Sequence, residues 1–361
     1  MKRSFIREIL DVIGSDTVSF AGGLPDETLF PMEQFAAIAG KVAASPAAFQ
    51  YAGSLGEKEL RARIAARYTE RGFPTDPEEI LVTTGGQQAL DLIARVHREE
   101  AIAVPQPAYL GALGVFAYSG LRVLPALGGG TLAYLMSDFS NPAGERMEEE
   151  ERERTARSLA AAPTLLVEDG AYSELWFDHP SLPIAARMPE QSYHVGSFSK
   201  ILAPGLRVGW VRASRERLRP LLVCKERADL HTPGLNQRII LAFWETYGLD
   251  GHIGLLRERY REKRDLLASA LEKGLPSMAF RKPEGGMFLY GRFPETVDAR
   301  KLALASLEAG AVFVPGEEFY LDGGGRNEGR FNFSHPTPEA MERGVGIIAR
   351  TLAELEATAP R

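Results

Sequence analysis

The chain has 361 residues, of which 45% are hydrophobic and 25% charged, the proportions of an ordinary globular protein. Its 42 basic and 48 acidic residues give a formal net charge of −6, which argues against nucleic acid as the main partner because domains that bind it are usually basic. The one cysteine, Cys224, excludes an internal disulfide and a cysteine-cluster metal site. We expect a cytoplasmic protein, since the sequence opens without a signal peptide and contains no run of about eighteen apolar residues that could span a membrane.

The middle of the chain alternates short apolar segments with longer helical patterns. Strands are expected at 80–83, 101–104, 122–124, 132–136, 164–167, 193–197 and 208–211. Helices with apolar residues spaced three and four apart are expected at 60–68, 87–97 and 148–159. Several strand segments are apolar throughout, as is typical of strands covered on both faces. This alternation predicts an α/β fold with a mainly parallel sheet, in which ligands bind at the carboxyl ends of the strands.

The two ends of the chain differ in pattern from the middle. A helix is expected at 4–13. After the middle, helices are expected at 253–272, 299–309 and 338–355, and strands at 287–290, 312–314 and 330–333. This mixture predicts a smaller α+β domain. We expect three parts: an N-terminal arm that belongs partly to the small domain (1–44), a large domain (45–255) and a small C-terminal domain (256–361).

A lysine with two serines and an arginine nearby follows the strand expected at 193–197. The sequence reads SFSK at 197–200 and PGLRVGW at 204–210. The hydroxyl groups of Ser197 and Ser199 and the guanidinium of Arg207 suit a phosphate dianion, because neutral donors fix its position and arginine neutralises its charge. Lys200 beside such a site can form a Schiff base with an aldehyde on the same phosphorylated molecule. Pyridoxal phosphate is the cofactor that needs such a lysine.

Three further elements follow strands and suit the same cofactor. Asp169, in VEDGAY, supplies a carboxylate that keeps a pyridine nitrogen protonated. Tyr172, three residues later, and Asn141, in SNPAG, can hydrogen-bond the phenolic oxygen of the ring. The turn TGGQQ at 84–88 precedes a helix, whose backbone N–H groups and positive end favour a phosphate.

Together these motifs resemble those of the fold type I, class I/II pyridoxal-phosphate-dependent aminotransferases, over nearly the whole chain. The chain looks most like the subgroup of 2-aminoadipate aminotransferases and the enzyme-like domain of MocR-type regulators. Also similar to that group are SFAGGLPDETLFP at 19–31, QYAGSLG at 50–56, PAYLGAL at 107–113, ADLHTPGLNQ at 228–237, PEGGMF at 283–288 and VFVPGEEFY at 312–320. The resemblance implies an α/β fold: a large domain with a seven-stranded, mainly parallel sheet between helices, and a smaller α+β domain.

The resemblance implies a role for each residue through its motif. The implied catalytic residues are Lys200 as the Schiff-base lysine, Asp169 as the partner of the pyridine nitrogen, and Tyr172 at the phenolate oxygen. The implied cofactor-binding set contains these three and Tyr51 from a second subunit, Gly86, Gln87, Tyr109 stacked on the ring, Asn141, Ser197, Ser199 and Arg207. The implied substrate-binding set is Arg330 at the α-carboxylate, Arg7 at a distal carboxylate, Gly23 and Asn141. Arg7 fits equally well a plain amphipathic helix in which it pairs with Asp11.

The sequence departs from the family in three places. It reads NPAG where NPTG is commoner, although Asn141 is retained. Gly86 stands where a small hydroxyl residue often helps to bind phosphate, so we expect a weaker contact there. Between Leu124 and Leu132 the chain is short, and a helical segment expected in the family is missing, which affects the outer edge of the large domain more than the site.

The resemblance implies transfer of an amino group from an L-amino acid to a 2-oxo acid, expected to be 2-oxoglutarate, by a ping-pong mechanism. The implied partners are these small molecules and a second copy of the chain, in a homodimer with shared active sites; neither nucleic acid nor a membrane is expected. The sequence leaves the donor open among dicarboxylic, aromatic and branched-chain amino acids. It also leaves open β-lyases and racemases, which use the same lysine and aspartate on this fold.

Three alternative functions are less consistent with the sequence. A cofactor- or effector-sensing module of the MocR kind follows a DNA-binding winged helix, whereas here the family pattern begins almost at Met1, so we expect a free-standing enzyme. Ser197 and Lys200 also fit the S-x-x-K of serine β-lactamases, but the S-D-N and K-T-G that must follow are absent from the sequence. The six histidines have no paired spacing, so no metal is expected.

Overall fold

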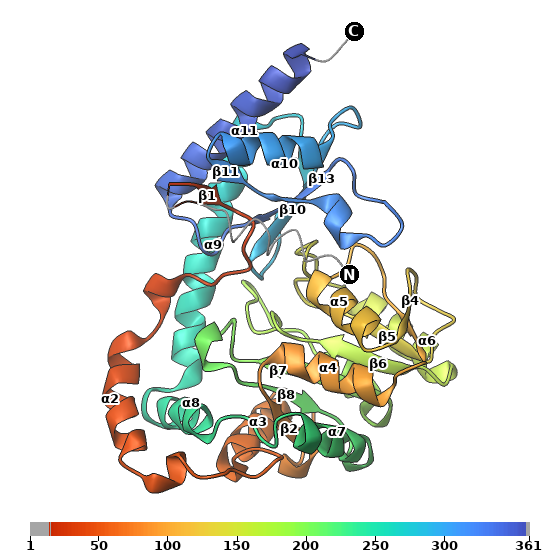
Figure 1. The fold of residues 1–361 in the computed structure, drawn as a ribbon, viewed down its shortest axis with the longest axis vertical. Coiled ribbons are helices and arrows are strands. Elements are labelled where there is room, and N and C mark those ends of the chain that lie inside the picture. The colour runs from red at the N-terminus through yellow and green to blue at the C-terminus, as the bar shows by residue number, and fades with distance from the viewer. Residues whose placement is uncertain (1–13, 15, 359–361) are drawn as a thin grey trace.

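The computed structural model describes residue 14 and residues 16–358, so the helix expected at 4–13 and Arg7 lie outside the described residues. Figure 1 shows two regions, one built around a large sheet and one around a smaller sheet, with the long helix α9 (Leu249–Gly274) running between them. None of the helices in the described part is long and apolar enough to cross a membrane. Because α9 is continuous through the predicted boundary at 255/256, we keep the division into domains as a proposal.

Seven strands form the large sheet, in the order β2-β8-β7-β6-β5-β3-β4. They are β2 (Ile80–Thr83), β3 (Ala101–Ala103), β4 (Arg122–Leu124), β5 (Leu132–Leu135), β6 (Leu165–Asp169), β7 (Ser192–Ser197) and β8 (Gly209–Arg212). Neighbouring strands are parallel except at β8, which is antiparallel to β2 and β7. The predicted α/β fold with a mainly parallel, seven-stranded sheet is therefore confirmed, and each predicted strand end lies within two residues of the observed one.

Helices cover both faces of this sheet (Figure 1). They are α3 (Lys58–Glu70), α4 (Gly86–Val96), α5 (Leu110–Tyr118), α6 (Glu149–Ala161), α7 (Arg215–Ala228) and α8 (Gly234–Tyr247), whereas α2 (Met32–Ala43) packs against α8. Successive strand residues point to opposite faces. Thus Leu81 of β2 packs in the apolar cluster with α4, α5 and α7, whereas its neighbours Ile80 and Val82 pack in the cluster with α3, α8 and α9. This two-sided burial explains why the strands are apolar throughout.

The connection from β4 to β5 contains no helix and consists of residues 125–131. Both strands are parallel to β3, one on each side of it. A crossover between parallel strands usually takes a dozen residues or more and includes a helix. The structure thus confirms that a helical segment is missing here, and it confines the change to the β4 edge of the sheet.

The second region contains a four-stranded antiparallel sheet, in the order β12-β13-β10-β9, and a parallel pair of β1 and β11. The strands are β1 (Val18–Ser19), β9 (Ala279–Phe280), β10 (Phe288–Arg292), β11 (Ala311–Val312), β12 (Val314–Pro315) and β13 (Glu328–Asn332), and the helices are α10 (Ala299–Glu308) and α11 (Pro338–Thr358). Short 3-10 helices occur at Glu27–Leu29, Pro46–Ala48, Pro77–Glu79, Ile184–Arg187, Pro189–Gln191, Pro204–Leu206 and Gly316–Phe319.

The single strand expected at 312–314 is wrong. Val312 pairs with Ser19 in one sheet, and Val314 pairs with Arg330 in another. The apolar run therefore forms the ends of two short strands, and the chain changes sheets at Phe313, which is fully buried. This switch joins the N-terminal segment to the strand that carries Arg330.

Candidate active site

The polar residues singled out in the sequence gather at one edge of the large sheet. Asp169 and Ser197 end the parallel strands β6 and β7, and Asn141 follows β5. Carboxyl ends of parallel strands lie at the same edge, so these side chains converge. Arg207 lies at the same edge because it comes shortly before β8. This strand is antiparallel to β7, so β8 starts at the edge where β7 ends.

Lys200 is the half-buried amine of this group. Its Nζ donates a hydrogen bond to the Gly23 carbonyl oxygen over 2.8 Å and lies 6.0 Å from the centre of the Tyr172 ring. Burial lowers the pKa of the amine to about 8, and the positive charges of Arg330 and Arg207 lower it in the same direction. Lys200 is therefore half neutral at about pH 8, as a nucleophile or proton acceptor must be.

Asp169 is a buried carboxyl group with a donor on each oxygen. The Tyr134 hydroxyl donates to Oδ2 over 3.0 Å, and the backbone N–H of Ala171 donates to Oδ1 over 3.1 Å. Burial raises the pKa of Asp169 to about 6, although both hydrogen bonds and the charge of Lys200 act in the opposite direction. Asp169 is thus ionised at neutral pH but only by a narrow margin.

The turn before α4 forms a cradle for an anion. Gly85 has φ of 80°, and a Cβ there would lie 2.6 Å from the Arg207 guanidinium, so only glycine allows this close approach. The Ser199 N–H donates to Ser197 Oγ over 3.1 Å, and Ser197 lies beneath Gly86. A guanidinium, two hydroxyl groups and a helix N-terminus are the donors that hold a phosphate.

A polar network of Thr84, Gln88, Lys225 and Asp229, in which Lys225 is the buried member, supports this turn. Gln88 Oε1 accepts hydrogen bonds from the Thr84 N–H over 2.7 Å and from Lys225 Nζ over 2.9 Å. Asp229 accepts from Gln88, from the Thr84 hydroxyl and from Lys225. The Lys225 side chain is fully buried. Because every member is paired, the network fixes the turn in one conformation.

A hydrogen bond connects Tyr109 and Gln87 next to the cradle. The Tyr109 hydroxyl donates to Gln87 Oε1 over 3.3 Å, and Gln87 Nε2 donates to the Gly111 carbonyl over 3.0 Å. A Cβ at position 111 would lie 2.4 Å from the Tyr109 ring, so the ring rests directly on the α5 backbone. This contact limits the movement of the Tyr109 ring.

Arg330 is a buried cation without a carboxylate partner in the part of the chain that the structure describes. Its guanidinium donates to Asn141 Oδ1 over 2.7 Å and to the Ala21 carbonyl, and lies 4.4 Å above the Phe288 ring. Its Nε has no hydrogen-bond partner among the described residues. Burial lowers the pKa of Arg330 to about 10. A buried charge of this kind calls for an anionic ligand.

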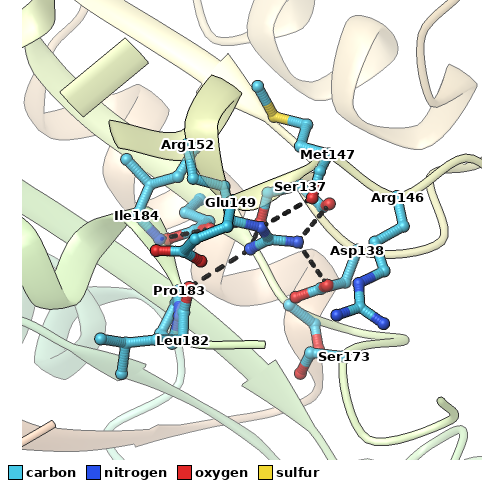
Figure 2. Close-up of polar contacts among 12 residues, drawn as sticks. Ser137, Asp138, Arg146, Met147, Glu149, Arg152, Ser173, Leu182, Pro183 and Ile184 are labelled. Carbon is cyan, nitrogen blue, oxygen red and sulfur yellow. Dashed lines mark hydrogen bonds and ion pairs between the residues drawn. The ribbon is translucent and has the colours of Figure 1, made fainter. Parts of the chain in front are cut away.

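A buried network supports the segments that carry Asn141 and Asp169, and Figure 2 shows its contacts around Arg152. Arg152 of α6 donates to Asp138 Oδ1 over 2.5 Å and to the Ser137 carbonyl over 2.8 Å. The Ser137 hydroxyl bonds to Glu168, which also accepts two backbone N–H groups. Asp138 lies three residues before Asn141, and Glu168 is adjacent to Asp169, so one cluster anchors both strand ends.

A cavity of about 70 Å³ opens on the other face of the sheet, beside α3. Its lining includes Tyr68, His194 and Trp210, which are linked because the Trp210 N–H donates to the Tyr68 oxygen and the Tyr68 hydroxyl bonds to His194 Nδ1. Among the predicted site residues only Ser197 contributes to this lining. Lys200, Asp169 and Arg330 do not line the cavity, so it is separate from the group of polar residues at the strand ends.

Among the described residues, the structure brings all but one of the predicted site residues together. The gathered residues are Gly23, Gly86, Gln87, Tyr109, Asn141, Asp169, Tyr172, Ser197, Ser199, Lys200, Arg207 and Arg330. Tyr51 is apart: it is 78% exposed and its ring contacts His231. Arg7 lies outside the described residues. Sequence analysis missed Tyr134, Lys225 and Arg152, since an isolated buried polar residue carries no motif.

Comparison with known proteins agrees with this arrangement. The family model described as "Aminotransferase class I and II" matches residues 21–127 and 135–348. The chain is 35% identical to an aromatic-amino-acid aminotransferase of Thermococcus litoralis, over 98% of this chain and 92% of that protein. The break in the match, at 128–134, covers the second half of the short β4–β5 connection and most of β5.

Two solved structures share the fold over almost the whole chain. An alpha-aminoadipate aminotransferase of Thermus thermophilus, complexed with N-(5'-phosphopyridoxyl)-L-leucine, is 34% identical with a TM-score of 0.90 and covers 99% of this chain and 96% of its own. A kynurenine aminotransferase of Pyrococcus horikoshii, in complex with PMP, is 31% identical with a TM-score of 0.92 over the same shares. The chain belongs to the class I and II aminotransferase family, which confirms the resemblance seen in its motifs.

Proposed function

We propose that the chain is a pyridoxal-phosphate-dependent aminotransferase that moves an amino group from an L-amino acid to a 2-oxo acid. One observation carries this proposal: the half-buried, partly neutral Lys200 lies near both the Asp169 carboxylate and Arg330, which has no carboxylate partner among the described residues, beside an anion cradle. The family and its relatives, which are named as aminotransferases, support it.

The residues present fit the cofactor. Lys200 would hold it through Nζ, and Ser197, Ser199, Arg207 and the turn at 85–87 would hold its phosphate. Asp169 would pair with the pyridine nitrogen, Asn141 and Tyr172 would bond to the phenolic oxygen, and Tyr109 would stack on the ring. When bound, the cofactor stabilises the negative charge that develops at the α-carbon of the substrate.

The protein's own groups bind the substrate and move the proton. Arg330, together with Asn141 and Gly23, orients the amino acid through its α-carboxylate, because a buried guanidinium with a free N–H prefers a carboxylate. Lys200 Nζ, in its neutral form, accepts the α-proton and later releases it. The low pKa of this amine supplies the neutral form near pH 8.

The finer parts of the proposal concern substrates and assembly. We propose 2-oxoglutarate as the amino acceptor and a cytoplasmic homodimer as the working form, in which the exposed Tyr51 reaches the partner's site. Arg7 would meet a distal carboxylate if the donor is dicarboxylic. One relative is named for aromatic amino acids and another for 2-aminoadipate, so the names support both aromatic and dicarboxylic donors.

The test is an absorbance spectrum of the purified protein, before and after single amino acids are added without a 2-oxo acid. A visible cofactor band that collapses to the near-ultraviolet band of the aminated cofactor would establish half of the amino transfer. A band that shifts without collapsing would contradict the proposal and favour a lyase, a racemase or a sensor. A protein that shows no band after pyridoxal phosphate is added would contradict it altogether.

Arg330→Gln is expected to weaken recognition of the α-carboxylate. Removing one partner of a buried, hydrogen-bonded charge pair costs about 2–5 kcal/mol, so kcat/KM for amino acids should fall by about thirtyfold or more. The decisive measurement compares an amino acid with the amine that lacks its α-carboxylate. Wild-type protein should discriminate strongly and the variant weakly; unchanged discrimination would place the carboxylate elsewhere.

Gly86→Ser is expected to tighten cofactor binding. A Cβ at this position would meet only Val195 at 3.6 Å and Ser197 at 3.9 Å, which are ordinary contacts, so the added hydroxyl can join the cradle. A hydrogen bond to a charged group contributes about 1.5–3 kcal/mol, equivalent to about tenfold or more in affinity. The dissociation constant is measured by titrating the cofactor-free protein with pyridoxal phosphate. Gly86→Ala, which adds the methyl group alone, is the control; equal effects of both changes would exclude the hydroxyl contact.

A further inference from the structure

Tyr134 is a buried polar residue that no sequence motif includes and that contacts the centre of the site. It lies on β5 opposite Val167 of β6, so its side chain projects on the same face as Asp169, two residues further along β6. Its ring packs edge-on against Phe116, with 5.3 Å between the ring centres. Its hydroxyl reaches the Asp169 Oδ2 atom over 3.0 Å.

The direction of this hydrogen bond follows from chemistry. An ionised carboxylate only accepts hydrogen bonds, so the phenol is the donor. The Ala171 N–H occupies the other oxygen, Oδ1. One donor on each oxygen determines the rotation of the Asp169 carboxyl plane. The Ala171 donor is two residues from Asp169 in the chain, whereas the Tyr134 donor comes from the neighbouring strand β5.

We infer that Tyr134 is a positioning residue whose hydroxyl keeps the Asp169 carboxylate ionised and in one orientation toward the pyridine nitrogen of the cofactor. The inference rests on the proposed function and goes beyond it, because it assigns the state of the carboxylate to a residue on a neighbouring strand. A hydrogen bond to the charged form of an acid favours that form. For a carboxyl group this deeply buried, loss of the bond favours the neutral acid, which cannot pair with a pyridinium.

The other titratable groups near Asp169 can be distinguished from the Tyr134 hydroxyl by the pH at which they act. In the cofactor-free protein the Lys200 amine also favours the carboxylate, but its own pKa of about 8 places its titration on the alkaline side. The Tyr172 phenol has a pKa raised by burial, and the Tyr109 phenol lies nearby as well. His194 packs against the residue after Asp169, and burial lowers its pKa to about 4, so it stays neutral above pH 6. A mutation of Tyr134 that moves the acid limb of the pH–activity profile therefore reports on the Asp169 carboxyl group.

The experiment uses the holoenzyme of Tyr134→Phe, which keeps the ring and its packing against Phe116 and removes the hydroxyl. The acid limb of the kcat/KM profile should move up by about one to two pH units, the size expected for one hydrogen bond to a charged group. Activity of the variant relative to the wild type should therefore fall most at the acid end of the profile and recover as the pH rises.

A second readout does not depend on turnover. Pyridoxal phosphate is titrated into the cofactor-free protein at pH 6 and pH 8.5, and its dissociation constant should weaken in Tyr134→Phe at pH 6 much more than at pH 8.5. The matched control is Tyr193→Phe, which removes a buried hydroxyl on β7 that bonds to His97 and has no bond to Asp169. This control should leave the position of the acid limb unchanged.

Two results would overturn the inference. The first is a Tyr134→Phe profile whose acid limb stays at the wild-type pH, whether kcat/KM is unchanged or is lowered equally at every pH. The hydroxyl would then contribute to packing only. In that case normal cofactor binding by the wild type would leave the proposed function standing. A wild-type protein that takes up no pyridoxal phosphate would overturn the proposed function and the inference together.

Discussion

Lys200→Ala is expected to abolish turnover while the protein stays folded. The change removes both the covalent anchor and the proton acceptor, and a general base alone contributes about 10²–10⁴-fold. The loss should therefore exceed about 10⁴-fold. Stability should change little, because burial already disfavours the charged amine, as its lowered pKa shows, and its hydrogen bond goes to a single carbonyl.

The measurements are steady-state activity and thermal unfolding followed by circular dichroism. Lys225→Met is the matched control, since Lys225 is a fully buried lysine that pairs with Asp229 and Gln88, away from Asp169. It should lower stability and cofactor affinity yet leave turnover measurable at saturating cofactor. Activity of Lys200→Ala within tenfold of the wild type would contradict the assignment of this residue.

Arg152→Met is expected to produce the largest loss of stability. Breaking a buried ion pair by removing one partner costs about 3–5 kcal/mol, because the other charge stays buried. Arg152 and Asp138 are both buried, and the guanidinium also holds the carbonyls of Ser137 and Met147 (Figure 2). The free energy of unfolding, measured with denaturant, should fall accordingly. Arg154→Met, an exposed arginine of the same helix, should change it by less than about 0.5 kcal/mol.

The pH dependence of this variant tests the physical cause. Burial already raises the pKa of Asp138, and Arg152 opposes that rise. Without the guanidinium the folded-state pKa rises further above its unfolded value. A raised acid pKa means that stability is lost as pH increases through it, so the deficit should be larger at pH 8 than at pH 5. Arg152→Met combined with Asp138→Asn should regain part of the loss; a deficit that is equal at both pH values would exclude an uncompensated carboxylate as its cause.

The sequence by itself determined the sheet and the principal side chains of the site. Alternating apolar and helical segments predicted all seven strands of the large sheet, because strands buried on both faces must be apolar throughout. Lys200, Ser197 and Ser199 were recognisable since they lie within four residues of one another and follow a strand. Their motif and the one around Asp169 are local, so they can be read along the chain without knowledge of the fold.

Only the tertiary structure decided which groups tune those side chains. The hydrogen bond of Lys200 to Gly23 joins residues 177 positions apart, and that of Arg330 to Asn141 joins residues 189 positions apart. Tyr134 and Arg152 act across neighbouring elements in the same way. A buried polar residue looks in the sequence like any other member of its strand or helix. Its partner, and therefore the pKa that it controls, is set by packing between segments that are distant along the chain.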